Sequence, residues 1–295
     1  MVMKTKTIYF RILILVLFWF ILISQAVYSQ DTESHNKPVK EGKMFIGFTL
    51  DPVQTKISND EFSSALKIDE GMSVNMTVNF GYFFTSKAGI TIGAGYSSYS
   101  SELSLDSTSI KYQTIDSENE NFEMRIAGKS IIEDQKISML SIPVCAYLRF
   151  SVSEKIGIYL RPGLSFNIPL SKTYDGNGTF TYDGYYADYP VLLQNLPEYG
   201  LPSNLNTSSS GTLELKSFNT ALIASGGMSY SVNNNISLLL GFCFSKSLGN
   251  ISSYTHDPNY KLSSKANELN SIMAGSSSAG FQSFGISLGF MYYLK

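Results

Sequence analysis

Charged residues are scarce in this chain. Only 16% of its 295 residues are Asp, Glu, Lys or Arg, which is few for a soluble protein. The 22 basic and 24 acidic residues leave a formal net charge of -2. Because phosphate binding needs concentrated Lys and Arg, this balance gives no reason to expect nucleic acid as a partner.

Cysteine and histidine are nearly absent. The two cysteines, Cys145 and Cys243, lie far apart, and the two histidines are His35 and His256. With no C-x-x-C pair and no Cys/His cluster, we predict no metal site and no cofactor. Both cysteines fall within predicted strands, so we expect structural thiols rather than a disulfide.

The N-terminus has the pattern of a signal peptide. Basic residues up to Arg11 precede an apolar run at 12–23, and small residues follow. This run is shorter than the roughly 20 residues of a spanning helix, which disfavours a membrane anchor. We predict a signal peptide over 1–29, with cleavage after Ser29 or, alternatively, after Ala26. A flexible periplasmic lead-in over 30–42 and a β-barrel over 43–295 would follow.

Alternation of apolar and polar residues dominates the mature chain. Eight segments place apolar side chains on even numbers, which is the period of a strand with two different faces. Each is roughly long enough to cross a bilayer when tilted. The segments cover residues 44–50, 74–84, 90–96, 140–150, 156–170, 218–232, 236–244 and 284–294.

The odd-numbered face is small and polar, as at Asn75, Thr91 and Ser165. A soluble barrel would need Lys and Glu on its exterior, so we place the apolar face in lipid and the polar face in the lumen. A soluble secreted β-barrel is kept as an alternative. The predicted fold is all-β, an eight-stranded antiparallel up-and-down transmembrane β-barrel with long extracellular loops. Side chains fill such a barrel, so no open pore is expected.

Short and long connections alternate along the chain. Tight turns are predicted at 85–88, 151–155 and 233–235, and long loops follow the first, third, fifth and seventh segments. This is the pattern of short periplasmic turns and long extracellular loops. We therefore expect both termini in the periplasm and an interfacial aromatic girdle beside the short turns. Its members would be Tyr82, Phe84, Phe150, Tyr230, Phe290 and Tyr292.

The strand sequences resemble a known family. Its soft hydrophobic motifs match Ile142-Pro143-Val144, Tyr147 to Phe150, Gly157 to Gly163, and Gly285-x-x-x-Gly289-Phe290-x-Tyr292. This pattern is similar to the PorT-type outer-membrane β-barrels. The resemblance implies a small porin-family barrel, and its namesake is implicated in protein secretion. It also implies secretion components as partners. The predicted location adds outer-membrane lipid and lipopolysaccharide, and Phe290 and Tyr292 favour insertion by the barrel-assembly machinery. The chain departs from the usual assembly signal because it ends in Leu294-Lys295 rather than an aromatic residue.

Two arginines are the candidate lumen charges. Arg161 is predicted well inside the barrel and Arg149 nearer its periplasmic rim, and we expect no strand-core carboxylate to pair with either. They would supply an anion-binding or gating charge, or simply bond lumen tyrosines, carbonyls and water.

The third long loop contains a tyrosine-rich near repeat. Residues 173–178 and 181–186 read as a surface hairpin with a glycine turn, and their spacing fails the EF-hand calcium pattern. Tyrosine offers apolar area and a hydroxyl at low entropic cost, so exposed tyrosines are candidates for recognition of a ligand. They are Tyr174, Tyr182, Tyr185, Tyr186 and Tyr189.

The second long loop is rich in charge. Residues 109–128 are predicted as a hairpin, and we expect its carboxylates and Glu133 to form a solvated acidic rim. Such a rim would allow divalent cations to bridge it to lipopolysaccharide. The chain lacks a G-x-S-x-G motif. We predict a non-enzymatic outer-membrane barrel that binds an extracellular partner or serves envelope assembly or secretion. The alternative is a barrel hydrolase or acyltransferase using His256.

Overall fold

The computed structural model describes residues 44–59, 66–255, 257–276 and 278–294. The predicted signal peptide and lead-in, together with His35 and His256, lie outside the described residues. Within that described part no helix is long and apolar enough to cross a membrane.

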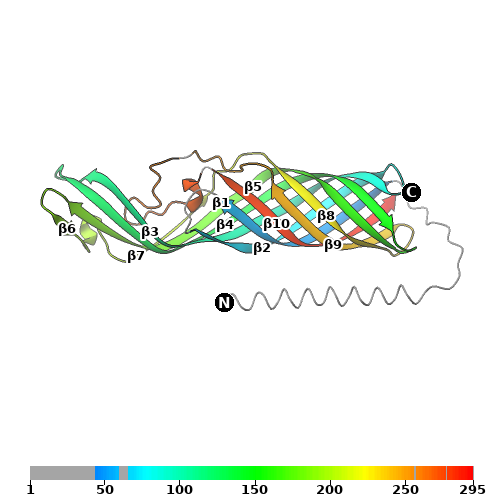
Figure 1. Ribbon diagram of the computed structural model, residues 1–295, viewed down its shortest axis with the longest axis horizontal. Helices are drawn as coiled ribbons and strands as arrows, with labels where there is room; N and C mark the ends of the chain where they lie inside the picture. Colours follow the sequence, from blue (N-terminus) through cyan, green and yellow to red (C-terminus); the bar gives the residue numbers. More distant parts are fainter. Residues whose placement is uncertain (1–43, 60–65, 256, 277, 295) are drawn as a thin grey trace. The chain divides into compact units, whose positions relative to one another are not determined.

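Ten strands and two short 3-10 helices make up the fold (Figure 1). Short segments complete it: β6 (Val191–Leu193), η1 (Pro197–Tyr199), β7 (Leu205–Thr212) and η2 (Ile272–Gly275). The eight long strands are β1 (Met44–Asn59), β2 (Lys67–Phe83), β3 (Ala88–Ile115), β4 (Asn121–Ser151), β5 (Ile156–Tyr186), β8 (Asn219–Ser231), β9 (Ile236–Ser247) and β10 (Ala279–Leu294).

These eight strands close into an antiparallel barrel, as predicted. Each pairs with its neighbour along the chain, β8 pairs with β5, and β10 returns to β1. When each residue is followed to its paired residue on the next strand, a path that starts at Ile46 returns to β1 at Lys56. The strand register therefore shifts by ten residues over one full circuit of the barrel. Such a stagger tilts the strands by roughly 40° to the barrel axis. The partners are Ile46, Phe80, Ile92, Val144, Leu164, Leu222, Lys246, Gln282 and Lys56.

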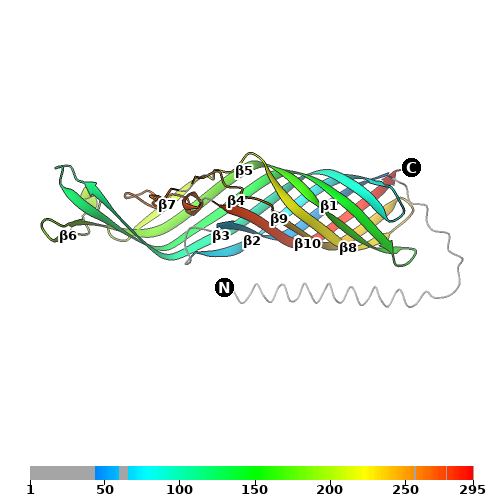
Figure 2. The ribbon, with the colours of Figure 1, turned by 45° about the horizontal axis from the view of Figure 1, so that its top comes forward.

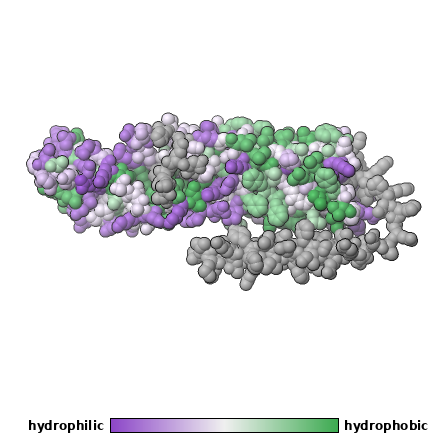
Figure 3. Space-filling view, viewed as in Figure 1, coloured by the Kyte–Doolittle hydropathy of each residue, from purple (hydrophilic) through white to green (hydrophobic). Residues whose placement is uncertain are grey.

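The alternation predicted from the sequence is the alternation of the two barrel faces. Even-numbered residues such as Val78 and Phe242 are exposed at 54% and 46%, whereas odd-numbered Thr91 and Tyr147 are buried. Figure 3 shows the resulting hydrophobic band over the barrel and a hydrophilic surface beyond it. Because lipid covers this band in a membrane, its exposed apolar side chains match a bilayer-spanning barrel.

The two barrel ends differ as predicted. Three tight turns connect β2 to β3, β4 to β5 and β8 to β9, and Met44 pairs with Leu294 at the same end. We call this the short-turn end; it corresponds to the periplasmic side. All six predicted girdle aromatics are exposed there. They surround the barrel at the height of the lipid headgroups.

At the other end, three strands extend into the regions where the second and third long loops were expected, whereas the connection from β9 to β10 is a long loop as predicted. β3 has 28 residues and β4 and β5 have 31 each, although about 9–11 cross a bilayer. Their outer parts, residues 103–115, 121–137 and 172–186, form with β6 and β7 what we call the outer sheet (Figures 1 and 2). The hairpin predicted at 109–128 is confirmed as its tip, but the third loop is no hairpin. The near repeat belongs to one continuous strand, β5, which pairs with β4 on one side and with β7 on the other.

Candidate functional site

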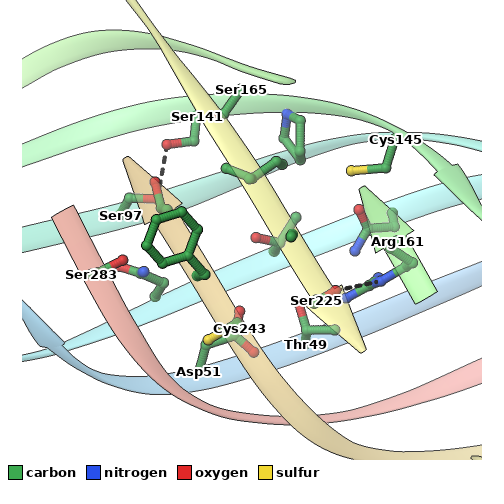
Figure 4. Close-up of a pocket in the computed structure, with 18 of the residues that line it drawn as sticks. Thr49, Asp51, Ser97, Ser141, Cys145, Arg161, Ser165, Ser225, Cys243 and Ser283 are labelled. Atoms are coloured by element: carbon green, nitrogen blue, oxygen red, sulfur yellow. Dashed lines mark hydrogen bonds between the residues drawn. The ribbon is translucent and has the colours of Figure 1, made fainter. Parts of the chain in front are cut away.

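A polar chamber lies in the middle of the barrel (Figure 4). Its volume is about 90 Å³, and its walls are the small polar side chains that the strands turn inward. Arg161 on β5 is 8% exposed and donates from Nε to the Ser225 hydroxyl at 3.0 Å. Its guanidinium carbon lies 5.7 Å from the centre of the Tyr159 ring. The predicted position of Arg161 deep inside the lumen is therefore confirmed.

Asp51 contributes a carboxylate to the same chamber. The sequence pattern predicted that the first strand ends at Leu50, whereas β1 continues to Asn59 and so brings Asp51 into the barrel. Asp51 and Arg161 both line the chamber, but no ion pair joins them among the described residues. Asp51 Oδ1 and the hydroxyls of Tyr159 and Ser287 lie close together, and none of them makes a hydrogen bond of ordinary geometry among the described residues. Buried polar atoms of this kind are ordinarily satisfied by water.

Aromatic side chains fill the barrel at the short-turn end. This cluster, which we call the inner plug, consists of Phe45, Phe83, Tyr147, Tyr159, Leu239, Met291 and Tyr293. The Phe45 ring lies over Gly81, where an added Cβ would overlap it. Arg149 sits at the rim, as predicted, with its guanidinium 4.3 Å from the Phe83 ring centre. It donates to the Ser86 carbonyl and the Tyr293 hydroxyl, so its planar cation covers the plug.

A second apolar cluster, the outer plug, fills the barrel at the other end. Its members come from five barrel strands and from the connections before β8 and around η2. The connections before β8 and around η2 thus fold back over the chamber and do not extend into solvent. The residues are Ile57, Tyr99, Ile137, Met139, Leu213, Leu215, Ala221, Ile251, Met273, Ala279 and Phe281.

Glu133 of β4 holds the η2 segment in place. Its carboxylate accepts hydrogen bonds from the Ser271 hydroxyl at 2.9 Å, the Ile272 backbone N–H at 2.6 Å and the Gln135 side chain at 2.7 Å. Only 2% of Glu133 is exposed, so the prediction that it belongs to a solvated acidic rim was wrong. Burial raises the pKa of Glu133, and its hydrogen bonds from Gln135 and from residues 271–273 offset this shift only in part.

This raised pKa predicts a pH-dependent attachment of η2. Below 4.5, the ordinary pKa of the group, the stabilisation is fully present, and it decreases as the pH rises through the raised value. We therefore expect amide hydrogen exchange at Ile272 and Met273, corrected for intrinsic rates, to accelerate as the pH is raised above 4.5. Glu133→Gln should remove this dependence. Equal pH dependence in both proteins would contradict the assignment.

The five candidate tyrosines do not share one exposed surface. Tyr189 is 60% exposed, but Tyr182 is fully buried beneath the outer sheet, where its hydroxyl lies 2.7 Å from that of Ser263. Tyr174, Tyr185 and Tyr186 are half-buried. The expectation of an exposed patch was thus wrong for Tyr182, because the strand alternates in burial where we had expected a loop. A role of these tyrosines in recognition stays a prediction.

The acidic turn at the tip of the outer sheet is ordered by its own side chains. Asp116 Oδ1 accepts the backbone N–H groups of Glu118 and Glu120, and Oδ2 accepts the Tyr186 hydroxyl at 2.9 Å. These bonds lower the pKa of Asp116, while burial and the nearby carboxylates raise that of Tyr186 to about 12. Asn119 takes the left-handed conformation, with φ of 64°, that closes the turn. The β3–β4 hairpin therefore ends in a defined structure.

The described residues also bear on the predictions for metal ligands, cysteines and lumen arginines. They contain no group of three or more potential metal ligands. Cys145 and Cys243 are both free thiols facing the chamber, as predicted. The functions proposed for Arg149 and Arg161 in anion binding or gating stay predictions.

Three solved structures are similar in fold to this chain. Neisserial surface protein A shares 13% identity, covering 85% of this chain and 97% of its own, with a TM-score of 0.38. Ail of Yersinia pestis shares 12%, covering 85% and 99%, with a TM-score of 0.33. OprG of Pseudomonas aeruginosa shares 13%, covering 86% and 97%, also with a TM-score of 0.33.

No curated protein matches the sequence. A family profile does: residues 28–253 match the family described as outer membrane protein beta-barrel domain. This match spans most of the chain and agrees with the closed eight-stranded ring, its lipid-facing band and its filled interior. The chain belongs to the outer membrane protein beta-barrel domain family.

Proposed function

We propose that this outer-membrane barrel is a non-enzymatic, non-conducting support that presents the outer sheet to other molecules outside the cell. The observation that carries the proposal is the uninterrupted continuation of β3, β4 and β5 beyond the apolar band. A barrel that served only to span the membrane would not need these extensions, because its strands could end within about 9–11 residues.

The outer sheet has its own hydrophobic core, which supports a binding role. Side chains of β3, β4 and β5 pack against residues that precede and form η2, including Leu262 and Leu269. Two hydrogen bonds hold the same segment, from Tyr112 to the Ser264 carbonyl and between Tyr182 and Ser263. Since a binding surface loses less entropy when it is already ordered, such packing favours recognition over a flexible tether.

The interior supports the proposed absence of conductance. The chamber has room for only a few waters and lies between two apolar plugs. We expect the full chain, reconstituted in planar bilayers, to give no stable single-channel current. A reproducible open channel would contradict the closed lumen.

Photo-cross-linking in intact cells tests presentation of the outer sheet. A photoreactive amino acid at Tyr189, which is exposed at the tip, is expected to give discrete protein adducts outside the cell. The matched control is Val152, which is 58% exposed in a tight turn at the short-turn end. Identical extracellular adducts from both positions, or none from Tyr189, would contradict the proposal. If the protein turned over a lipid or a peptide and His256→Ala abolished this turnover, the result would instead support the alternative of a barrel hydrolase or acyltransferase.

The PorT-type resemblance extends the proposal in one direction. If the chain is of that type, the partner presented to the outer sheet would be a component of secretion. Deleting the gene should then reduce the amount of secreted protein, and the full chain should restore it. Its insertion by the barrel-assembly machinery into lipopolysaccharide-containing membrane is part of the same proposal.

A further inference from the structure

β3 has one open edge in the outer sheet. Its pairing with β2 ends at Ser104, opposite Lys67, whereas its pairing with β4 continues to Ile115. Residues 105–115 therefore have a strand on one side only among the described residues. On the far side of the sheet, β5 is covered by β7 and β6 over most of the same height. Among the described residues, the β3 edge is thus the longer unpaired strand edge of the outer sheet.

The hydrogen-bonding groups of this edge belong to the odd-numbered residues. The Asp116 N–H donates to the Glu120 carbonyl, in register with the β3–β4 ladder. Because bonding direction alternates along an antiparallel strand, even-numbered residues of β3 bond to β4. The N–H and C=O groups of residues 107, 109, 111, 113 and 115 then point away from the sheet.

Little in the sequence protects this edge from pairing. Proteins commonly protect exposed edges with prolines, bulges or several charges. Residues 107–115 contain neither proline nor glycine, and they pair with β4 without a register shift. Their hydroxyl, β-branched and aromatic side chains favour a strand. Lys111 is the one charged residue in this stretch, and Asp106, at the start of the edge, forms an ion pair with Lys67 of β2 at 2.7 Å.

Lys111 lies in an unbalanced electrostatic position. Its cross-strand partner on β4 is Arg125, and like charges directly opposite each other are unfavourable. Arg125 pairs with Glu123 at 2.6 Å, while Lys111 takes part in no ion pair of the described residues. An acidic side chain supplied from the open edge would balance this charge.

Resting on the proposed presentation of the outer sheet, we propose that the β3 edge binds an extended segment of another protein as an added strand. The segment has alternating apolar and polar residues, with an acidic side chain beside Lys111. Its apolar side chains lie on the face of Ile110 and Tyr112, which pack against the core of the outer sheet. Main-chain hydrogen bonds supply affinity, and the side chains on the two faces supply selectivity.

A second copy of this chain is a poorer occupant. Two copies in one membrane point the same way, so their β3 edges would meet in parallel, which is the less stable ladder. Such a pairing would also bring two Lys111 side chains near each other.

Peptide binding to the full chain in lipid nanodiscs tests the proposal. The probe is a fluorescent nine-residue peptide in which valine alternates with threonine around one central glutamate, measured by anisotropy. We expect saturable binding. Ser109→Pro, which removes an edge N–H and leaves the β4 ladder intact, should weaken it by about tenfold or more. Ser109→Ala, the matched control, should stay within about twofold of the wild type.

Charge reversal provides a second variant that does not alter the backbone. Lys111→Glu should weaken the glutamate peptide by about tenfold and strengthen a peptide with central lysine. Heat-modifiable migration on gels shows that each variant is folded. No saturable binding, or equal binding by Ser109→Pro, would overturn the proposal. So would a wild-type dimer that Ser109→Pro dissociates, which would assign the edge to a second copy. Tyr189 cross-links that persist in Ser109→Pro would leave the proposed function standing without this edge.

Discussion

Replacing Val78 by arginine is expected to lower the free energy of unfolding by about 2–4 kcal/mol, the range for arginine on the lipid face near the bilayer midplane. Val78 lies in the middle of the β2 span, between Phe48 of β1 and Ala94 of β3, and 54% of it is exposed to the surroundings of the barrel. In lipid, the guanidinium would lose its hydration and find no protein partner. Urea titration of the protein folded in lipid vesicles measures the change.

Val152→Arg is the matched control for this substitution. Val152 is similarly exposed, at 58%, but lies in the turn between β4 and β5, where water and headgroups surround it. Its replacement should change stability by about 1 kcal/mol or less, because the cost falls towards the interface. Equal effects at the two positions would mean that the exposed apolar band does not face lipid.

Phe45→Ala is expected to destabilise the barrel by about 3–5 kcal/mol. The ring is 1% exposed and contacts Phe83, Tyr147 and Tyr293 in the inner plug, with ring centroids 5.3 to 6.0 Å apart. Truncation would remove these contacts and leave a cavity that the tilted barrel strands cannot close. Phe45→Leu, which keeps most of the volume, should lose much less. Urea titration again provides the measurement.

Gly81 supplies an internal check on the same packing. A Cβ there would overlap the Phe45 ring, so Gly81→Ala alone should cost about 1–3 kcal/mol by overpacking. In a Phe45→Leu background the added methyl group has room, and the combined loss should be smaller than the sum of the single losses. If the losses in unfolding free energy of the two single variants simply added in the double variant, the Phe45 ring would not lie against Gly81 in the membrane.

The spanning part of the fold was predictable because each residue there carries its own signal. A strand residue such as Val78 or Asn79 faces either lipid or lumen, and no other environment exists for it. The period of two therefore located the barrel strands, the girdle and the free thiols from sequence alone. The depths of Arg149 and Arg161 followed from their distances to the short turn between β4 and β5.

Beyond the membrane the same reasoning was insufficient. Glu133 and Asp51 look like exposed loop carboxylates in the sequence, but one accepts bonds from η2 and the other faces Arg161. Polar residues between predicted spans suit either a loop or a strand extending into solvent. Tyr182 is buried by a segment that lies about 80 residues later in the sequence, in which the Ser263 hydroxyl forms a hydrogen bond with the Tyr182 hydroxyl. The residues next to each of these positions in the sequence do not indicate such long-range contacts.

The sequence by itself determined the eight-stranded barrel and which side chains face lipid, because a bilayer imposes a period that can be read within each strand. Only the tertiary structure decided that β3, β4 and β5 continue as an outer sheet, that apolar plugs flank the chamber, and that one edge of β3 has no partner strand among the described residues. These features depend on which distant segments meet, and in water such pairings are selected by packing and register rather than by a pattern local to either segment.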